Sequence, residues 1–256
     1  MDLGIKGKVA VVTGASSGIG YAIAHRLAEE GCRLVMFART PEKLQHAVDE
    51  IKRDTGSEVV GVSGDMSTGA DVDRLAAETK SAFGAPDILV LNTGRPPLGM
   101  REALDETDDS RWEEANRAML WSGILVLRTI MPLIVARGNG RVIAVTSASV
   151  KQPMKHHALS TVYRAGLTGL LKHLANENAA KGVTVNMVCP ASVETESFKA
   201  YWGPIGITER RKQVPMGRFG RPEELAGAVA FLASDFAGFI TGESIHVDGG
   251  MVACLN

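Results

Sequence analysis

Residues 13–20 read TGASSGIG and directly follow the apolar run Val9–Val12. Beyond the glycines, Ile19, Ile23 and Leu27 recur at the spacing of one helix face. The stretch therefore predicts a strand, a tight glycine turn and a helix. Such a turn brings backbone N–H groups to a helix N-terminus, whose partial positive charge favours an anion. We expect a dinucleotide pyrophosphate to bind there; the alternative is a glycine turn that only reverses the chain.

The composition fits a single globular domain over residues 1–256. The chain has 256 residues, 45% of them hydrophobic, and no proline-rich or serine-rich linker, so one large core is possible. A formal net charge of -1 and a pI of about 6.6 provide no basic field for nucleic acid or for a membrane surface. We expect a small-molecule substrate, with neither nucleic acid nor membrane as a partner.

The N-terminus and the cysteines indicate a cytoplasmic protein without a metal site. The first residues, MDLGIKGK, lack the apolar core of a signal peptide, and no uncharged apolar run is long enough to cross a bilayer. Cys32, Cys189 and Cys254 are far apart and lack metal-ligand spacing. We expect free thiols in a reducing compartment.

Short β-rich runs alternate with helical stretches along the whole chain. This alternation predicts right-handed βαβ units in a doubly wound, Rossmann-type α/β fold, with a seven-stranded, mostly parallel sheet flanked by helices. Ligands of such a fold bind beyond the carboxyl ends of the strands. The expected strands are Val9–Thr13, Arg33–Ala38, Glu58–Gly64, Ile88–Asn92, Arg141–Ser147, Val183–Cys189 and Ser244–Val247.

Residues 191–217, after the sixth expected strand, form an unusually long connection, which is typical of a substrate lid. Phe198, Tyr201 and Trp202 are candidates for a wall of the substrate pocket. The alternative is a helical flap on which the basic residues 210–212 face solvent.

Several short motifs occur in chain order from one end of the sequence to the other. They are TGASSGIG at 13–20, Asp65-Met66, Asn92-Thr93-Gly94, Val185-Asn186 before Pro190, GRPEE at 220–224, Thr241-Gly242 and VDGG at 247–250. Together they resemble the classical short-chain dehydrogenase/reductase family. Residues 215–242 are similar to the C-terminal part of bacterial 3-oxoacyl-acyl-carrier-protein reductases.

The resemblance implies a nicotinamide nucleotide and the residues that hold it. The implied residues are Gly14, Ser16, Ser17, Gly18, Ile19 and Gly20 at the pyrophosphate, Asp65 and Met66 at the adenine, Asn92 and Gly94 at the ribose, and Val193 and Thr195 at the carboxamide. Each residue also has a purely structural alternative, such as Asp65 capping a turn or Val193 belonging to the core.

Ala38-Arg39, at the end of the second expected strand, indicates which nucleotide is preferred. An acid at this place would accept from the ribose 2′-hydroxyl of NAD, whereas a guanidinium pairs with the 2′-phosphate of NADP. Arg39 therefore favours NADP. Ser17 stands where many NADP-binding relatives carry a basic residue, so an ordinary surface role for Arg39 stays open.

The proton chemistry of the family uses a Ser, a Tyr with a Lys four residues later, and an Asn on the preceding helix. Aligned through RAGL at 164–167, this chain keeps Ser147 but has Ser160 in place of the Tyr and Arg164 in place of the Lys. Aligned backward from Pro132, it has Met119 in place of the Asn. The fixed positive charge is retained and the acidic phenol is lost.

This substitution pattern leaves more than one interpretation. The leading hypothesis is an NADP(H)-dependent oxidoreductase in which Ser147 orients a carbonyl, Arg164 stabilises charge, and Ser160 or a water passes the proton. Other donor candidates are Tyr163, Lys151, Lys155, His156 and His157. The rivals are a non-catalytic NADP(H)-binding sensor or partner subunit, and a lyase or isomerase. The resemblance also implies a homotetramer or dimer formed through residues 112–134, 162–181 and the C-terminal strand.

Overall fold

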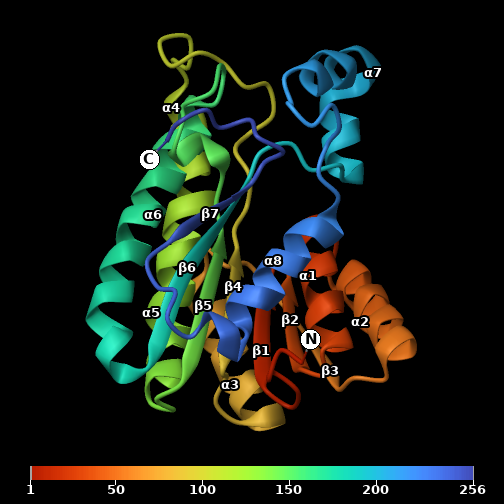
Figure 1. Cartoon of the computed structure of the whole chain (residues 1–256), viewed down its shortest axis with the longest axis vertical. Helices are drawn as coiled ribbons and strands as arrows, with labels where there is room; N and C mark the ends of the chain where they lie inside the picture. The colour runs from red at the N-terminus through yellow and green to blue at the C-terminus, as the bar shows by residue number, and fades with distance from the viewer. Residues whose placement is uncertain (1, 256) are drawn as a thin grey trace.

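The computed structural model describes residues 2–255, with the side chains of residues 200–205 outside the description. Seven strands form one sheet in the order β3-β2-β1-β4-β5-β6-β7, and all of the pairings are parallel (Figure 1). The strands are β1 Val9–Thr13, β2 Arg33–Ala38, β3 Val59–Ser63, β4 Ile88–Asn92, β5 Gly140–Val145, β6 Val183–Pro190 and β7 Ser244–Val247. The predicted doubly wound Rossmann-type fold is confirmed.

Helices cover both faces of the sheet because alternate strand residues point to opposite sides. Ala10 and Val12 of β1 pack in one core with α1, α2 and α8, whereas Val11 packs in a second core with α3, α5 and α6. The helices on the first face are α1 Gly18–Glu29, α2 Pro41–Thr55 and α8 Pro222–Ala233; those on the second are α3 Gly69–Phe83, α5 Ser122–Val135 and α6 Ala158–Asn178. Burial on both faces explains the near-continuous apolar strands.

The fifth expected strand ends two residues earlier than predicted. β5 stops at Val145, and Ser147 instead begins the 3₁₀ turn Ala148–Val150, with extended φ and ψ of -159° and 148°. Ser147 therefore lies just beyond the carboxyl end of the sheet, on a turn rather than inside a strand.

The helix that precedes β5 widens by one π-helical turn in its middle. The short helix α4, Asp109–Ala115, continues through the π-turn Asn116–Trp121 into α5. Gly94, after β4, donates its N–H to the Ala118 carbonyl at 3.1 Å, so the irregular turn ties this helix to the end of β4. Residues 109–135 are long and apolar enough to span a membrane by length and composition alone, but they pack here as a core helix against β4 and β5.

The lid predicted as a long loop consists mainly of a helix. Helix α7, Glu196–Lys212, stands away from the sheet near the carboxyl ends of its strands (Figure 1). Thr195 caps it by accepting from the Phe198 N–H at 3.1 Å, and the basic residues 210–212 complement the dipole at its last turn. The helix therefore matches the helical flap that the sequence left open as the alternative, and it forms for these local reasons.

Of the three aromatic residues predicted to form a wall of the substrate pocket, only Phe198 has a described side chain. Phe198 packs edge-on against Phe219, with ring centroids 4.9 Å apart, and Arg211 lies 5.6 Å from the same Phe219 ring. Tyr201 and Trp202 lie outside the described side chains.

Candidate functional site

The glycine turn is packed so closely that side chains cannot enter it. Gly14 and Gly18 have φ values of +60° and +57°, in the left-handed region that favours glycine. A Cβ on Gly20 would lie 2.1 Å from the Gly14 carbonyl oxygen, and a Cβ on Gly14 would lie 2.8 Å from the Asn92 Nδ2. The turn is therefore a backbone cradle of the shape that a pyrophosphate requires.

The start of α1 completes this anion site. Ser17 is the N-cap residue of α1, and the structure shows no hydrogen bond from its side chain to the described residues. The first turn of α1 carries no acidic residue. The N–H groups of this first turn, beside Ser16 and Ile19, are therefore left for an anion. The Thr195 Cγ2 lies 3.4 Å from the Cβ position of Gly18. The beginning of the lid thus faces the glycine turn across the site.

The end of β4 is locked to the same turn. The Asn92 N–H donates to Thr13 Oγ1 at 2.9 Å, Thr13 Oγ1 donates to the Asn92 carbonyl at 3.1 Å, and Asn92 Nδ2 donates to the Gly14 carbonyl at 3.4 Å. Gly94 follows, fixed by Ala118. The structure therefore brings the implied ribose residues next to the implied pyrophosphate residues.

The predicted adenine residues lie at the carboxyl ends of β2 and β3. Asp65 Oδ1 accepts from the N–H and the hydroxyl of Ser67, both at 2.8 Å, so its carboxylate caps a local turn. Met66 is half-buried beside it, and Arg39 is exposed at the end of β2. Val193 is buried and bridges to Gly220. These placements are compatible with both the ligand role and the structural role of each residue.

Arg164 is held by backbone oxygens from two strand ends. Its Nη2 donates to the Gly94 carbonyl at 2.9 Å, and its Nη1 donates to the Val145 carbonyl at 3.1 Å and to Thr93 Oγ1 at 3.4 Å. Burial lowers the pKa of Arg164 to about 10, which still leaves it charged at neutral pH. A positive charge is therefore fixed between the ends of β4 and β5. Sequence reasoning overlooked Thr93, whose only signal was a hydroxyl at a strand end.

Ser147 accepts two hydrogen bonds from one neighbour. The Ser149 N–H and the Ser149 hydroxyl donate to Ser147 Oγ at 3.1 Å and 3.0 Å, and Ser149 is fully buried. A hydroxyl has two lone pairs and one proton. Because both lone pairs are engaged, the Ser147 proton is left to donate to another group, as a residue that polarises a carbonyl must. Sequence reasoning did not find Ser149, since its role depends on the 3₁₀ turn.

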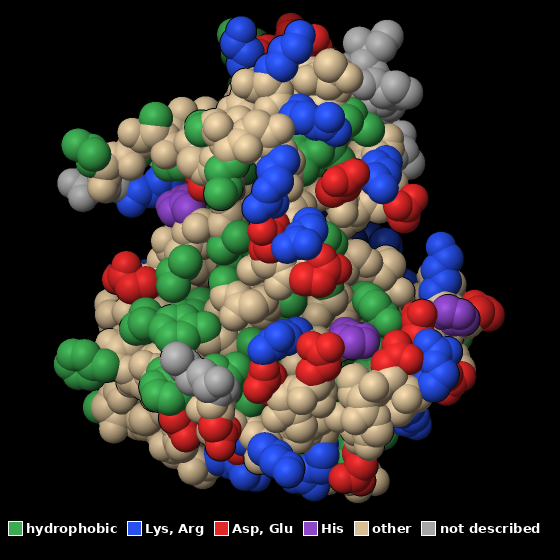
Figure 2. Space-filling view, turned by 45° about the vertical axis from the view of Figure 1, so that its right-hand side comes forward, with side chains coloured by type: hydrophobic (Ala, Val, Ile, Leu, Met, Phe, Trp, Pro, Cys, Tyr) green, Lys and Arg blue, Asp and Glu red, His purple; other side chains and the backbone are tan. Residues whose placement is uncertain are grey.

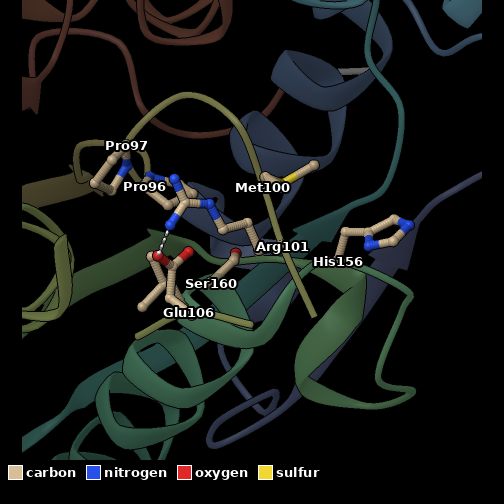
Figure 3. Close-up of a pocket in the computed structure, with 8 residues that line it drawn as sticks. Pro96, Pro97, Met100, Arg101, Glu106, His156 and Ser160 are labelled. Atoms are coloured by element: carbon tan, nitrogen blue, oxygen red, sulfur yellow. Dashed lines mark hydrogen bonds and ion pairs between the residues drawn. The ribbon is translucent and has the colours of Figure 1, made fainter. Parts of the chain in front are cut away.

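Ser160 opens onto a small cavity under the loop that follows β4. The cavity, of about 10 Å³, admits one water molecule. Ser160 itself is 6% exposed. In Figure 3, Arg101 reaches across this cavity toward Glu106, whose carboxylate also accepts from Arg111 Nε at 2.6 Å. The cavity is too small for a substrate, so Ser160 has room for a water and little else on this side.

Two other positions in the alignment are apolar or packed. Met119 is fully buried in the π-turn, in a cluster with Ala115 and Leu159. Tyr163 packs against that cluster and edge-on against Trp112, with centroids 6.1 Å apart, and burial raises the pKa of its phenol. Tyr163 is thereby a packing residue and a poor proton donor at neutral pH.

The basic residues before α6 separate into exposed and enclosed groups. Lys151 and Lys155 are exposed, and so is His156, which pairs with Glu102 at 3.4 Å. His157 is half-buried, and its Nδ1 lies 2.7 Å from the Lys155 carbonyl oxygen. The positive charge of Arg210, in α7, is among the effects that lower the pKa of His157.

The face near the lid carries mixed charge. A hollow of about 510 Å³ is lined by Glu194, Arg211, Gly217, Arg218, Phe219 and Arg221. Figure 2 shows Lys and Arg side chains interspersed with Asp and Glu over this side of the molecule.

The cysteines Cys32, Cys189 and Cys254 are free thiols. No group of three or more potential His, Cys, Asp or Glu metal ligands occurs among the described residues.

Comparisons with known proteins agree with this architecture. A family model described as "Enoyl-(Acyl carrier protein) reductase" matches residues 14–252. The 3-oxoacyl-[acyl-carrier-protein] reductase FabG of Escherichia coli K12 is 36% identical over 253 residues, covering 97% of this chain and 99% of that protein.

Two solved structures share the fold over nearly the whole chain. L-sorbose reductase from Gluconobacter frateurii, complexed with NADPH and L-sorbose, has a TM-score of 0.91 and 33% identity, and covers 100% of both chains. An NADPH-bound short chain oxidoreductase from Pseudomonas aeruginosa PAO1, described as containing an atypical catalytic center, has a TM-score of 0.88 and 33% identity, with 96% and 97% of the two chains covered.

Proposed function

Because this chain belongs to the short-chain dehydrogenase/reductase family of oxidoreductases, we propose that it interconverts a carbonyl and a secondary alcohol of a small molecule, using NADP(H). One observation carries the proposal. The fixed guanidinium of Arg164 and the hydroxyl of Ser147, whose proton Ser149 does not use, lie at the carboxyl edge of the sheet, where the glycine cradle also opens. Together they supply charge, a hydrogen-bond donor and an anion site at one place.

The cradle fits the nucleotide because Gly14 and Gly20 leave the backbone open to the pyrophosphate. A side chain at either position would collide with neighbouring atoms. Ser16, Ser17, Gly18 and Ile19 would offer N–H groups to the pyrophosphate. The remaining residues proposed to hold the nucleotide are Arg39, Asp65, Met66, Asn92, Gly94, Val193 and Thr195. When bound, the nucleotide supplies or accepts a hydride.

The protein's own residues would then manage charge and orientation. Ser147 donates to the carbonyl oxygen and orients it. Arg164 binds the nicotinamide ribose and stabilises negative charge that develops on that oxygen. Ser160, or a water in the cavity beside it, passes the proton.

We further propose a cytoplasmic homo-oligomer, a tetramer or a dimer. Its contacts would be made by the long helices α4–α5 and α6 and by the C-terminal strand β7. Exposed apolar side chains at Trp121 and Val162, on the first two of these elements, support such an interface.

Replacing Arg39 with alanine tests the preference for NADP. We expect the Kd for NADPH to rise by about 10- to 100-fold, because one charge-assisted contact to the 2′-phosphate is lost, while the Kd for NADH changes less than about twofold. Fluorescence titration of both nucleotides measures this. The matched control is Arg53→Ala, another exposed arginine, in the neighbouring helix α2, which should change neither. Equal losses for NADPH and NADH would remove the argument for NADP.

The activity itself is tested by following NADPH absorbance with ketones, β-ketoacyl thioesters, quinones and sugars. We expect turnover that Ser147→Ala lowers by about 10²- to 10³-fold, as for the loss of one donor to a developing oxyanion. Met119 and Ser160, in place of polar catalytic residues, favour the rival of a non-catalytic nucleotide-binding protein. That rival is supported if NADPH binds, no substrate is reduced, and Ser160→Tyr with Arg164→Lys creates activity.

A further inference from the structure

We propose that His157 exchanges the reacting proton with the substrate, taking the place of the missing phenol. The inference rests on the proposed function and names a residue that neither the family pattern nor the alignment assigns. It begins from Ser160, which lines a cavity of about 10 Å³. A serine hydroxyl is too weak an acid to release a proton near neutral pH without a partner. The site therefore needs a titratable group close to Ser160.

His157 is close to Ser160 by helix geometry. His157 is the residue immediately before α6, and Ser160 lies three residues later in the first turn. Residues three apart occupy neighbouring positions on one side of a helix. The same side faces the carboxyl edge of the sheet, since Arg164, one turn further along α6, reaches the ends of β4 and β5.

The imidazole is held in one orientation. Its Nδ1 lies 2.7 Å from the Lys155 carbonyl oxygen. A carbonyl oxygen only accepts, so Nδ1 carries the proton and donates it. The Nε2 of neutral His157 is consequently left with a lone pair, as a base that takes a proton from an alcohol requires.

A basic residue of the lid acts on this imidazole. Arg210, near the end of α7, acts on His157 electrostatically and places its Nε 3.4 Å from the hydroxyl of Ser192, two residues after β6. Arg210 thus links His157, at the start of α6, to the end of β6 at the carboxyl edge of the sheet. Ligands of this fold bind at that edge.

The surroundings favour the uncharged base. Burial lowers the pKa of His157, and the positive charges of Arg210 and His156 lower it further, against the opposing effect of the Lys155 carbonyl. The neutral form therefore dominates at pH 7, which suits oxidation of an alcohol. In that step the alcohol O–H proton passes through Ser160, or the water beside it, to His157 Nε2. The carbinol C–H hydride leaves with its electron pair to the oxidised nicotinamide, and the C–O bond becomes a carbonyl.

The test is His157→Gln, which keeps a polar side chain but removes the titration. We expect kcat for alcohol oxidation at pH 7 to fall by about 10²-fold, the lower range for general acid–base assistance, with KM and the Kd for NADPH nearly unchanged. The acid limb of the wild-type pH profile should disappear in this variant. His173→Asn is the matched control. It removes an exposed imidazole further along α6, so its kcat should stay within about twofold of wild type.

A second variant separates a chemical role from a structural one. Arg210→Gln removes a positive neighbour and should move the acid limb to higher pH, together with the pKa of His157 measured by NMR in the nucleotide-free protein. The thermal midpoint shows whether the His157→Gln variant folds. If the folded variant retains the kcat and the pH profile of wild type, the proposal for His157 is overturned while the enzyme function stands. If wild-type protein binds NADPH but neither reduces a carbonyl nor oxidises an alcohol, both the proposal for His157 and the proposed enzyme function are overturned.

Discussion

Gly20→Ala is expected to abolish nucleotide binding and to weaken the fold. The new Cβ would lie 2.1 Å from the Gly14 carbonyl oxygen and 2.8 Å from the Asn92 Nδ2. The first of these atoms is backbone, so the turn must open to accept the methyl group. We expect the free energy of unfolding to fall by about 1–3 kcal/mol and the Kd for NADPH to rise more than about 100-fold, which corresponds to about 2.7 kcal/mol. Urea unfolding and fluorescence titration measure the two effects.

Gly227→Ala provides the control for this change. Gly227 lies inside α8, and a Cβ there would meet nothing within 4 Å. We expect a gain in stability of about 0.5–1 kcal/mol, because alanine is the better helix former, and unchanged NADPH binding. A Gly20→Ala protein that binds NADPH within about threefold of wild type would show that the glycine cradle is not the nucleotide site.

Arg164→Met is expected to cost both stability and turnover. Methionine fills similar space but leaves the Val145 and Gly94 carbonyls without the donors that they have at 3.1 Å and 2.9 Å. Each unsatisfied buried acceptor costs about 1–3 kcal/mol, so we expect the free energy of unfolding to fall by about 2–4 kcal/mol. Loss of the fixed charge beside the reacting oxygen should lower kcat by about 10³-fold.

Arg164→Lys distinguishes charge from geometry. One ammonium nitrogen does not reproduce a guanidinium that spans two strand ends. This variant should therefore retain the charge but lose some of the hydrogen bonds to the ends of β4 and β5. We expect its kcat to lie between those of wild type and Arg164→Met, with both variants assayed below their thermal midpoints. Burial lowers the pKa of Arg164 only to about 10, so its titration should not contribute to the wild-type pH profile below pH 8. An Arg164→Met protein with wild-type kcat would remove Arg164 from the site.

The sheet was predictable because its strands carry strong local signals. Runs such as Val9–Thr13 and Ile88–Asn92 are apolar throughout and lie between turns, and the structure places strands at the same residues. The sequence left the lid region open between a long loop and a helical flap, because its helix depends on the Thr195 cap and on the charges at its ends. Those signals are weaker than hydrophobic periodicity.

The nucleotide residues were grouped by resemblance, and the structure places the glycine turn, Asn92, Gly94 and Thr195 around one cradle. The proton-handling residues were not resolved in the same way. Ser147 was recognised, but Ser149, which engages both of its lone pairs, was not. His157 was one of five candidate donors, and its half-buried position, which only the structure shows, separates it from His156 and the lysines.

Sequence alone established the fold class and the glycine turn, because these follow from residue type and spacing along the chain. The replacement of the phenol by Ser160 stays a prediction from the family resemblance. The folded chain decided which oxygens hold Arg164, which groups donate to Ser147 and which histidine is half-buried. Those properties depend on distances between segments that are far apart in sequence, such as Gly94 and Arg164. Local pattern carries no information about such distances, because packing of the sheet and its helices sets them.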